Sequence, residues 1–132
     1  MSLDGIFNSP ALQSLRLTMD DAALRQTAIS SNIANVNTPG YQRVDVSSTF
    51  QQAFTDALKG LGEGDTSVTA DNMPDASIET AAVQGPARPD GNTVQIESEM
   101  LDLAQNSARY EFAGQVMSQN FHGLKYAITG QS

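Results

Sequence analysis

Several absences narrow what this chain can do. Its 132 residues contain no cysteine, so neither a disulfide nor a thiolate metal site can form. His122 is the only histidine, which leaves only scattered carboxylates as metal ligands. The glycines at 60–64 lack the lysine and following helix of a phosphate loop. The sequence therefore predicts no metal, no cofactor and no small-molecule substrate.

Positive charge is also scarce. Lys and Arg number 7 against 15 Asp and Glu, a net charge of −8, which argues against a nucleic-acid partner. Between Asp56 and Asp102 the chain holds ten acids and two bases, so we expect this middle region to stay solvated. Neither long helical pattern has the strongly basic face of a membrane-surface helix.

No long apolar run is present, which excludes a bilayer-spanning helix. The first residues, MSLDGIFNSP, show neither the basic region nor the apolar core of a cleavable signal peptide. We therefore expect a cytoplasmic protein, unless the chain leaves the cell by a route that reads no such signal.

A first helix is predicted over residues 10–37. Ser9 can cap its start, and Pro10 suits the first helical position. Residues three and four apart then form a heptad seam with one polar member. The seam consists of Leu12, Leu15, Met19, Ala22, Gln26, Ile29, Ile33 and Val36.

A second helix is predicted over residues 94–130. Glu97, Glu99 and Asp102 crowd its start, where the helix dipole favours anions, and Gly130 is a plausible stop. Ser107 and Gly114 would let a partner helix approach closely. The predicted seam contains Ile96, Met100, Leu103, Ser107, Tyr110, Gly114, Met117, Phe121, Leu124 and Ile128.

Between the helices, residues 38–93 form a turn, a short helix and an extended stretch. An amphipathic pattern predicts the short helix over Ser48–Leu61. Residues 62–93 are rich in Gly, Pro, Asp, Ser and Thr, with strand-like pieces at Ser67–Ala70 and Ser77–Thr80. Such a long turn-rich stretch is expected to be mobile in the free chain.

The predicted fold class is therefore mainly α. Long terminal heptad helices pair as a coiled coil, joined by the extended acidic middle, and residues 1–132 form a single domain. A two-helix hairpin would leave apolar residues off the seam in water, at a cost of several kcal/mol (~1.5–3 for each large side chain). We therefore expect the helices to pack against other subunits as well. The residues concerned are Leu17, Leu24, Leu101, Ala108, Phe112 and Tyr126.

The stretch NIANVNTPGY, residues 32–41, ends the first helix. Thr38-Pro39-Gly40-Tyr41 suits a type II turn, with positive φ at Gly40. Asn37 can adopt the left-handed conformation of a helix end. Asn32 and Asn35 share a helix face, and we expect their amides to bond backbone across a helix interface.

These residues carry a family resemblance. The stretch SNIANVNTPGYQR resembles the N-terminal signature of bacterial flagellar axial proteins, which form the rod, hook and hook-associated structures. The last forty or so residues are similar to the C-terminal helix of proximal rod proteins of the FlgB type; the neighbouring FlgC type is the alternative. The assembly motif carried over is Asn32, Asn35, Asn37, Thr38, Pro39, Gly40 and Tyr41.

The resemblance implies a structural subunit of the proximal rod, in the periplasm, which polymerises through its terminal helices and transmits torque. The implied partners are other copies, FlgC-type and FlgF-type rod proteins, the adaptor FliE, the membrane ring FliF and the export gate. It implies export by the flagellar type III apparatus without a cleaved signal peptide.

Two other functions compete. Glu97, Glu99 and Asp102 could serve as paired carboxylates for cleaving cell-wall glycans, but acids at a helix start are common for dipole reasons alone. His122 has no identifiable catalytic partner, and we predict no enzyme. A soluble two-helix adaptor or chaperone is compatible with the heptads, and the Asn-Pro-Gly signature argues against it.

Overall fold

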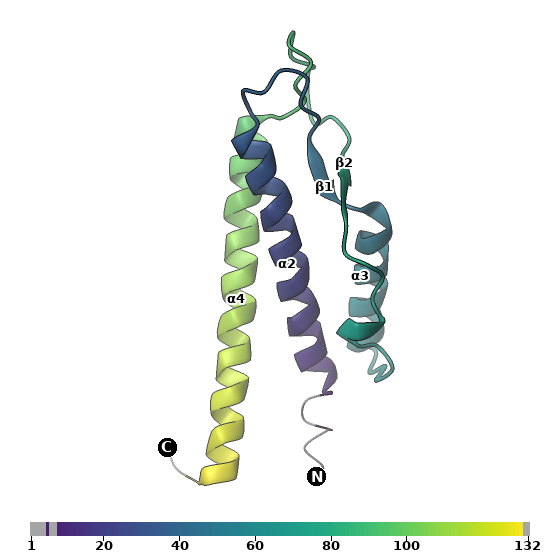
Figure 1. The fold of residues 1–132 in the computed structure, drawn as a ribbon. Helices are drawn as coiled ribbons and strands as arrows, with labels where there is room; N and C mark the ends of the chain where they lie inside the picture. The colour runs from purple at the N-terminus through teal and green to yellow at the C-terminus, as the bar shows by residue number, and fades with distance from the viewer. Residues whose placement is uncertain (1–4, 6–7, 131–132) are drawn as a thin grey trace.

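The computed structural model describes residue 5 and residues 8–130, and these residues are mainly helical (Figure 1). Along the chain the elements are α2 (Pro10–Ala34), β1 (Val44–Val46), α3 (Ser48–Gly62), the short 3₁₀ helix η1 (Ala70–Asn72), β2 (Ile78–Thr80) and α4 (Ile96–Thr129). The long N-terminal and C-terminal helices and the short helix between them are confirmed.

The helix ends follow local capping chemistry. The Ser9 hydroxyl accepts a hydrogen bond from Leu12 N at 3.3 Å, and Pro10 opens α2. Gly130 caps α4 with φ of 63°, as expected. Helix α2 ends at Ala34, three residues before the predicted end. The left-handed conformation predicted for Asn37 is wrong, because only glycines have positive φ among the described residues.

Helices α2 and α4 lie side by side and run antiparallel (Figure 1). Helix α3 and the small sheet lie on the other side of α2, so that α2 is the middle element (Figure 1). The molecule is therefore more than a two-helix hairpin. Helix α4 has 34 residues against 25 in α2, and only α2 is covered on two sides.

Helix α3 covers an apolar residue of α2 that lies off the predicted heptad seam. Leu17, which we expected to be exposed in a two-helix hairpin, is 2% exposed and packs against Ala57 and Leu61 of α3. Phe54, Val68, Ala70 and Met73 pack against this cluster. The middle segment thus supplies a second apolar layer for α2, and Leu17 needs no partner subunit to be buried.

The middle segment also forms a two-stranded antiparallel sheet. Strand β1 pairs with β2, with Asp45 opposite Glu79. The predicted strand at Ser77–Thr80 is confirmed as β2. The predicted strand at Ser67–Ala70 is wrong, since Ala70 begins η1 instead. Strand β1 was not predicted, because three residues are too few to show an alternating pattern.

Candidate assembly site

The signature stretch forms a tight turn. Gly40 has φ of 74°, and Tyr41 N donates to Thr38 O at 3.2 Å, as a type II turn requires. Gly40 N also donates to Asp90 O at 2.8 Å, which ties the turn to the segment that leads into α4. The predicted turn is confirmed, and it joins the two ends of the middle segment.

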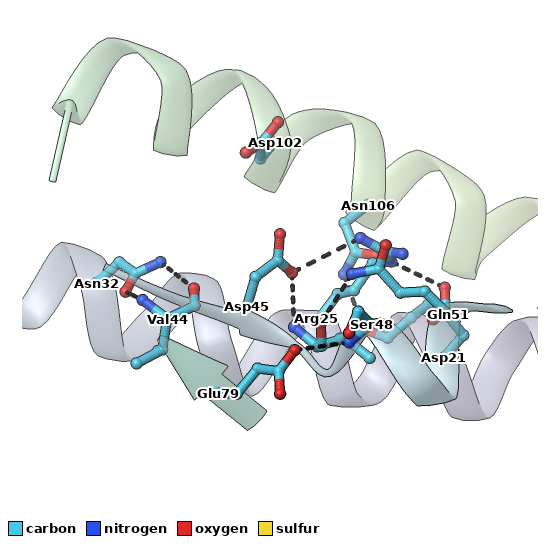
Figure 2. Close-up of polar contacts among 12 residues, drawn as sticks. Asp21, Arg25, Asn32, Val44, Asp45, Ser48, Gln51, Glu79, Asp102 and Asn106 are labelled. Atoms are coloured by element: carbon cyan, nitrogen blue, oxygen red, sulfur yellow. Dashed lines mark hydrogen bonds and ion pairs between the residues drawn. The ribbon is translucent and has the colours of Figure 1, made fainter. Parts of the chain in front are cut away.

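Asn32 is the most constrained asparagine of the signature. It is 0% exposed, and its side chain pairs with the backbone of Val44 in β1 (Figure 2). The amide nitrogen donates to Val44 O at 2.8 Å, and Val44 N donates to Asn32 Oδ1 at 2.9 Å. The side-chain amide therefore forms the two hydrogen bonds that a residue of a neighbouring strand would form with β1. As expected, Asn32 bonds backbone, but the backbone belongs to a strand rather than to a second helix.

The other two asparagines have different surroundings. Asn35 Nδ2 donates to Ser31 O at 2.9 Å, and Thr38 Oγ1 donates to Asn35 Oδ1 at 3.1 Å. These bonds close the end of its own helix, so the bond predicted for Asn35 across an interface is not present within this chain. Asn37 is exposed, as are Thr38, Pro39 and Gly40, whereas Tyr41 is half-buried.

Asn92, which sequence reasoning missed, caps the end of α2. Its side-chain nitrogen lies 2.9 Å from Asn35 O, 3.2 Å from Val36 O and 2.8 Å from Thr38 O, and the residue is 0% exposed. Arg88 Nη1 adds a bond of 2.6 Å to Val36 O. The last carbonyls of a helix need such partners. Because these partners lie more than fifty residues away, no local pattern revealed them.

A buried ion pair connects Arg43, the residue just before β1, to α4. Arg43 Nε lies 2.6 Å from Glu99 Oε1, and their side chains are 5% and 0% exposed. Glu99 Oε2 accepts from Asn32 Nδ2 at 3.1 Å. Both oxygens of Glu99 are thus occupied within the chain. Arg43 also lies 3.4 Å from Asp102 Oδ2, so two of the acids at the helix start neutralise one arginine.

We call the set formed by Asn32, Arg43, Asn92 and Glu99 the polar junction. Each member is buried, and together they join α2, β1, the 92–94 segment and α4. Arg43 and Asn92 carried no sequence signal. Glu99 was considered as a helix-start acid and as a candidate carboxylate for glycan cleavage, but not as a buried partner of Arg43 and Asn32. The junction fixes the direction in which the chain leaves α2 and enters α4.

A second polar contact joins α2 and α4 further from the signature turn. Asn106 Nδ2 donates to Ala22 O at 2.8 Å and to Gln26 Oε1 at 3.2 Å. Asp21, 0% exposed, accepts from Arg25 at 2.9 Å (Figure 2). One oxygen of Asp21 and the Oδ1 of Asn106 have no hydrogen-bond partner in the described chain. Beside them is a polar groove of about 250 Å³, lined by Arg25, Arg43, Asp45, Asp102, Asn106 and Arg109 among others.

The predicted heptad seam is only partly the contact within the chain. Ala22 and Ile29 are buried, and twelve other residues of the predicted seam are half-buried. They are Leu12, Leu15, Met19, Gln26, Ile33 and Val36 of the first predicted helix, and Ile96, Leu103, Ser107, Gly114, Met117 and Leu124 of the second.

Four predicted seam residues on α4 do not fit an intramolecular core. Met100, Tyr110, Phe121 and Ile128 are 52%, 45%, 46% and 66% exposed, so as contacts inside one chain they are wrong. The buried positions of α4 are instead Glu99, Asn106 and Ala113, seven residues apart. Glu99 and Asn106 take the inward positions because their hydrogen-bond partners lie on α2 and, for Glu99, also at Arg43 just before β1.

Helix α4 is exposed on its far side as well. Leu101, Phe112 and Tyr126 are 58%, 68% and 56% exposed. Large exposed apolar surfaces of this kind mark interaction sites.

His122 is exposed, and no group of three acids or histidines within residues 8–130 could hold a metal ion. No helix in the described part of the chain has the length and apolar character to cross a bilayer.

Comparison with known proteins agrees with this geometry. The family model described as "Flagella basal body rod protein" matches residues 12–42, which span most of α2, the turn and the first residues after it. This match indicates the class of flagellar basal body rod proteins.

Similar whole proteins identify the family more closely. The flagellar basal body rod protein FlgB of Bacillus subtilis (strain 168) is 30% identical over 125 residues, which cover 92% of this chain and 95% of that protein. FlgB of Aeromonas hydrophila is 31% identical, covering 81% and 83%, and FlgB of Salmonella typhimurium is 29% identical, covering 82% and 85%. The chain belongs to the FlgB family of flagellar basal body rod proteins.

Proposed function

We propose that this chain is a structural subunit of the proximal rod, which polymerises through its terminal helices. In that role it links the membrane ring and export gate to the rest of the rod and transmits torque. The exposed apolar surface of α4 is the observation that carries this proposal. A subunit that works only when surrounded by neighbours should keep such a surface open in the free chain.

The size of that surface supports assembly. Seven large apolar residues of α4 are between 45% and 68% exposed. Burying one such side chain fully is worth about 1.5–3 kcal/mol. Covering several of them would supply much of the free energy for docking a neighbour. The heptad spacing of the terminal helices favours coiled-coil pairing with helices of other subunits.

The polar junction supports the mechanical part of the proposal. Asn32, Arg43 and Glu99 hold α2, β1 and α4 together through buried, directional bonds. Removing one partner of such a buried pair costs about 3–5 kcal/mol, so the junction resists being pulled apart. A subunit that carries torque needs a fixed angle between its helices.

The family supports the partners and the location. We propose contacts with other copies, with FlgC-type and FlgF-type rod proteins, with the adaptor FliE, with the ring protein FliF and with export-gate proteins. The subunit would act in the periplasmic part of the basal body after export by the flagellar type III apparatus. The signature residues on the turn, exposed from Asn37 to Gly40, are available for such contacts.

Deletion of the gene tests the proposal directly. Basal structures isolated from the deletion strain and viewed by electron microscopy should show membrane rings without a rod, and the wild-type gene on a plasmid should restore it. Complementation with Phe112→Asp should fail although the protein is made, whereas Thr49→Asp, exposed at the start of α3, should restore rods. Intact rods and normal swimming in the deletion strain would refute the proposal and favour the adaptor function.

A further inference from the structure

Helix α4 carries an apolar ridge on the side that faces away from α2. Leu101, Ala108, Phe112 and Tyr126 are all exposed and fall on one face at ~100° per residue. We call these four residues the outer ridge. They lie opposite Glu99, Asn106 and Ala113, the buried positions of α4. No described element of the chain covers the outer ridge.

A groove runs along a different side of the same helix, where α4 meets α2. Two neighbouring hollows of about 350 and 420 Å³ lie along it. Their lining includes Met19, Ala22 and Ala23 from α2, and Tyr110, Gly114 and Phe121 from α4. We call this the α2–α4 groove. Small residues alternate with large ones in its lining, so a row of apolar side chains could enter between them.

The ridge and the groove have the same period. Outer-ridge positions are separated by seven, four and fourteen residues, and the groove positions Ser107, Tyr110, Gly114, Met117 and Phe121 by three and four. Both patterns average 3.5 residues, the spacing that keeps two helices in contact along their length. A helix with the period of α4 therefore matches the groove, and α4 of a second copy is such a helix.

Polar complementarity favours the same occupant. Asn106 borders the groove and is 4% exposed. Lys125 in the groove and Glu97 beside the ridge have no ion-pair partner within the described residues, and their charges are opposite.

We propose that the outer ridge of one copy docks into the α2–α4 groove of the next copy. The inference rests on the proposed polymerising function and names the contact between like subunits. Because ridge and groove are different surfaces, the contact is heterologous: each copy offers a ridge to one neighbour and a groove to another. A repeated heterologous contact builds a ring or an open helix rather than a closed dimer.

Thiol cross-linking tests this pairing, because the natural chain has no cysteine. Gly114→Cys marks the groove, and Leu101→Cys, Ala108→Cys and Phe112→Cys mark the ridge. Full-length proteins are treated with a short bismaleimide, singly and as mixtures of one groove and one ridge variant. The proposal expects a cross-linked dimer in at least one mixture and little in any single variant.

Three results would overturn the proposal. Cross-linking of a single variant with itself would show a symmetric contact instead. Assembly of the wild-type chain without any mixed product would show that other surfaces meet. A chain that stays monomeric at every concentration would mean that the groove takes a different rod protein. In each case the deletion experiment separately decides whether the chain is a rod subunit.

Filling the groove gives a second, independent measurement. A Cβ at Gly114 meets no atom within 4 Å, so Gly114→Leu should fold and yet obstruct a docking neighbour. Gly62→Leu in α3, which also meets nothing within 4 Å, is the matched control. Sedimentation should show at least a tenfold weaker self-association for Gly114→Leu only, with unchanged circular dichroism. Equal association of both variants would contradict the proposal.

Discussion

The side-chain amide of Asn92 lies 2.9 Å from the carbonyl oxygen of Asn35, and so closes α2 from a position 57 residues further along the chain. A helix normally ends with partners from its own last turn or from water. Here the partner belongs to the segment that immediately precedes α4. The end of one long helix and the start of the other are consequently parts of one structure.

This cap predicts a large effect of Asn92→Ala. The change leaves buried carbonyls without a donor, which should lower the free energy of unfolding by about 1–3 kcal/mol. Urea unfolding followed by circular dichroism measures the loss. Asn37→Ala is the control, because Asn37 is exposed, and it should change stability by less than about 0.5 kcal/mol. Equal effects of the two changes would show that Asn92 is not a cap.

Asn32→Asp separates shape from hydrogen bonding. Aspartate has nearly the same shape, but it cannot donate to Val44 O and places a second negative charge 3.1 Å from Glu99 Oε2. We expect a loss of about 3 kcal/mol or more, as for a buried charge without a partner. Asn35→Asp, whose bonds are local, should lose no more than about 1.5 kcal/mol. Thermal melts of both variants distinguish these outcomes, and a mild Asn32→Asp would contradict the proposed strand-like role of the amide.

The Arg43–Glu99 pair predicts strong coupling. Either Arg43→Met or Glu99→Leu alone leaves one buried charge without its partner, and should lower the free energy of unfolding by about 3–5 kcal/mol. The double variant should lose less than the sum of the two, with a coupling of up to about 3 kcal/mol. A double-mutant cycle in urea measures this difference. Additive losses would mean that the two side chains do not depend on each other.

The backbone conformation at Gly40 predicts that any side chain introduced there would strain the turn. A Cβ there meets no atom within 4 Å, but φ of 74° is unfavourable for a residue with a side chain. Gly40→Ala should therefore cost about 1–2 kcal/mol. Gly62→Ala, in a helix with ordinary φ, should be neutral or stabilise by up to about 1 kcal/mol. Differential scanning calorimetry compares the two, and a neutral Gly40→Ala would contradict the turn geometry.

Leu17 and Leu24 share a heptad position but not an environment. Leu17 is buried under α3, whereas Leu24 is half-buried. Leu17→Ala should therefore cost about 2–5 kcal/mol, and Leu24→Ala clearly less. Chemical denaturation of each variant measures the difference. If the two losses are equal, α3 does not pack on α2 in solution.

The sequence predicts the local elements well where their signals are local. Ser9 and Pro10 mark the start of α2, Gly130 the end of α4, and Pro39-Gly40 the turn, because capping and turn preferences act over a few residues. The family signature is equally local, and similarity to known proteins confirms the family that it indicates. The predicted assembly motif and partner contacts remain predictions.

The sequence alone did not predict the pairings between distant segments. Arg43 with Glu99, Asn92 with the end of α2, and Leu17 with α3 join residues that no short-range pattern connects. Glu99 and Asn106 occupy inward positions of α4 because their hydrogen-bond partners lie on α2 and at Arg43, which displaces the apolar seam outward. Periodicity determined that α2 and α4 are long amphipathic helices. Only the tertiary structure decided which side of α4 is buried, since that depends on hydrogen-bond partners supplied by other parts of the chain.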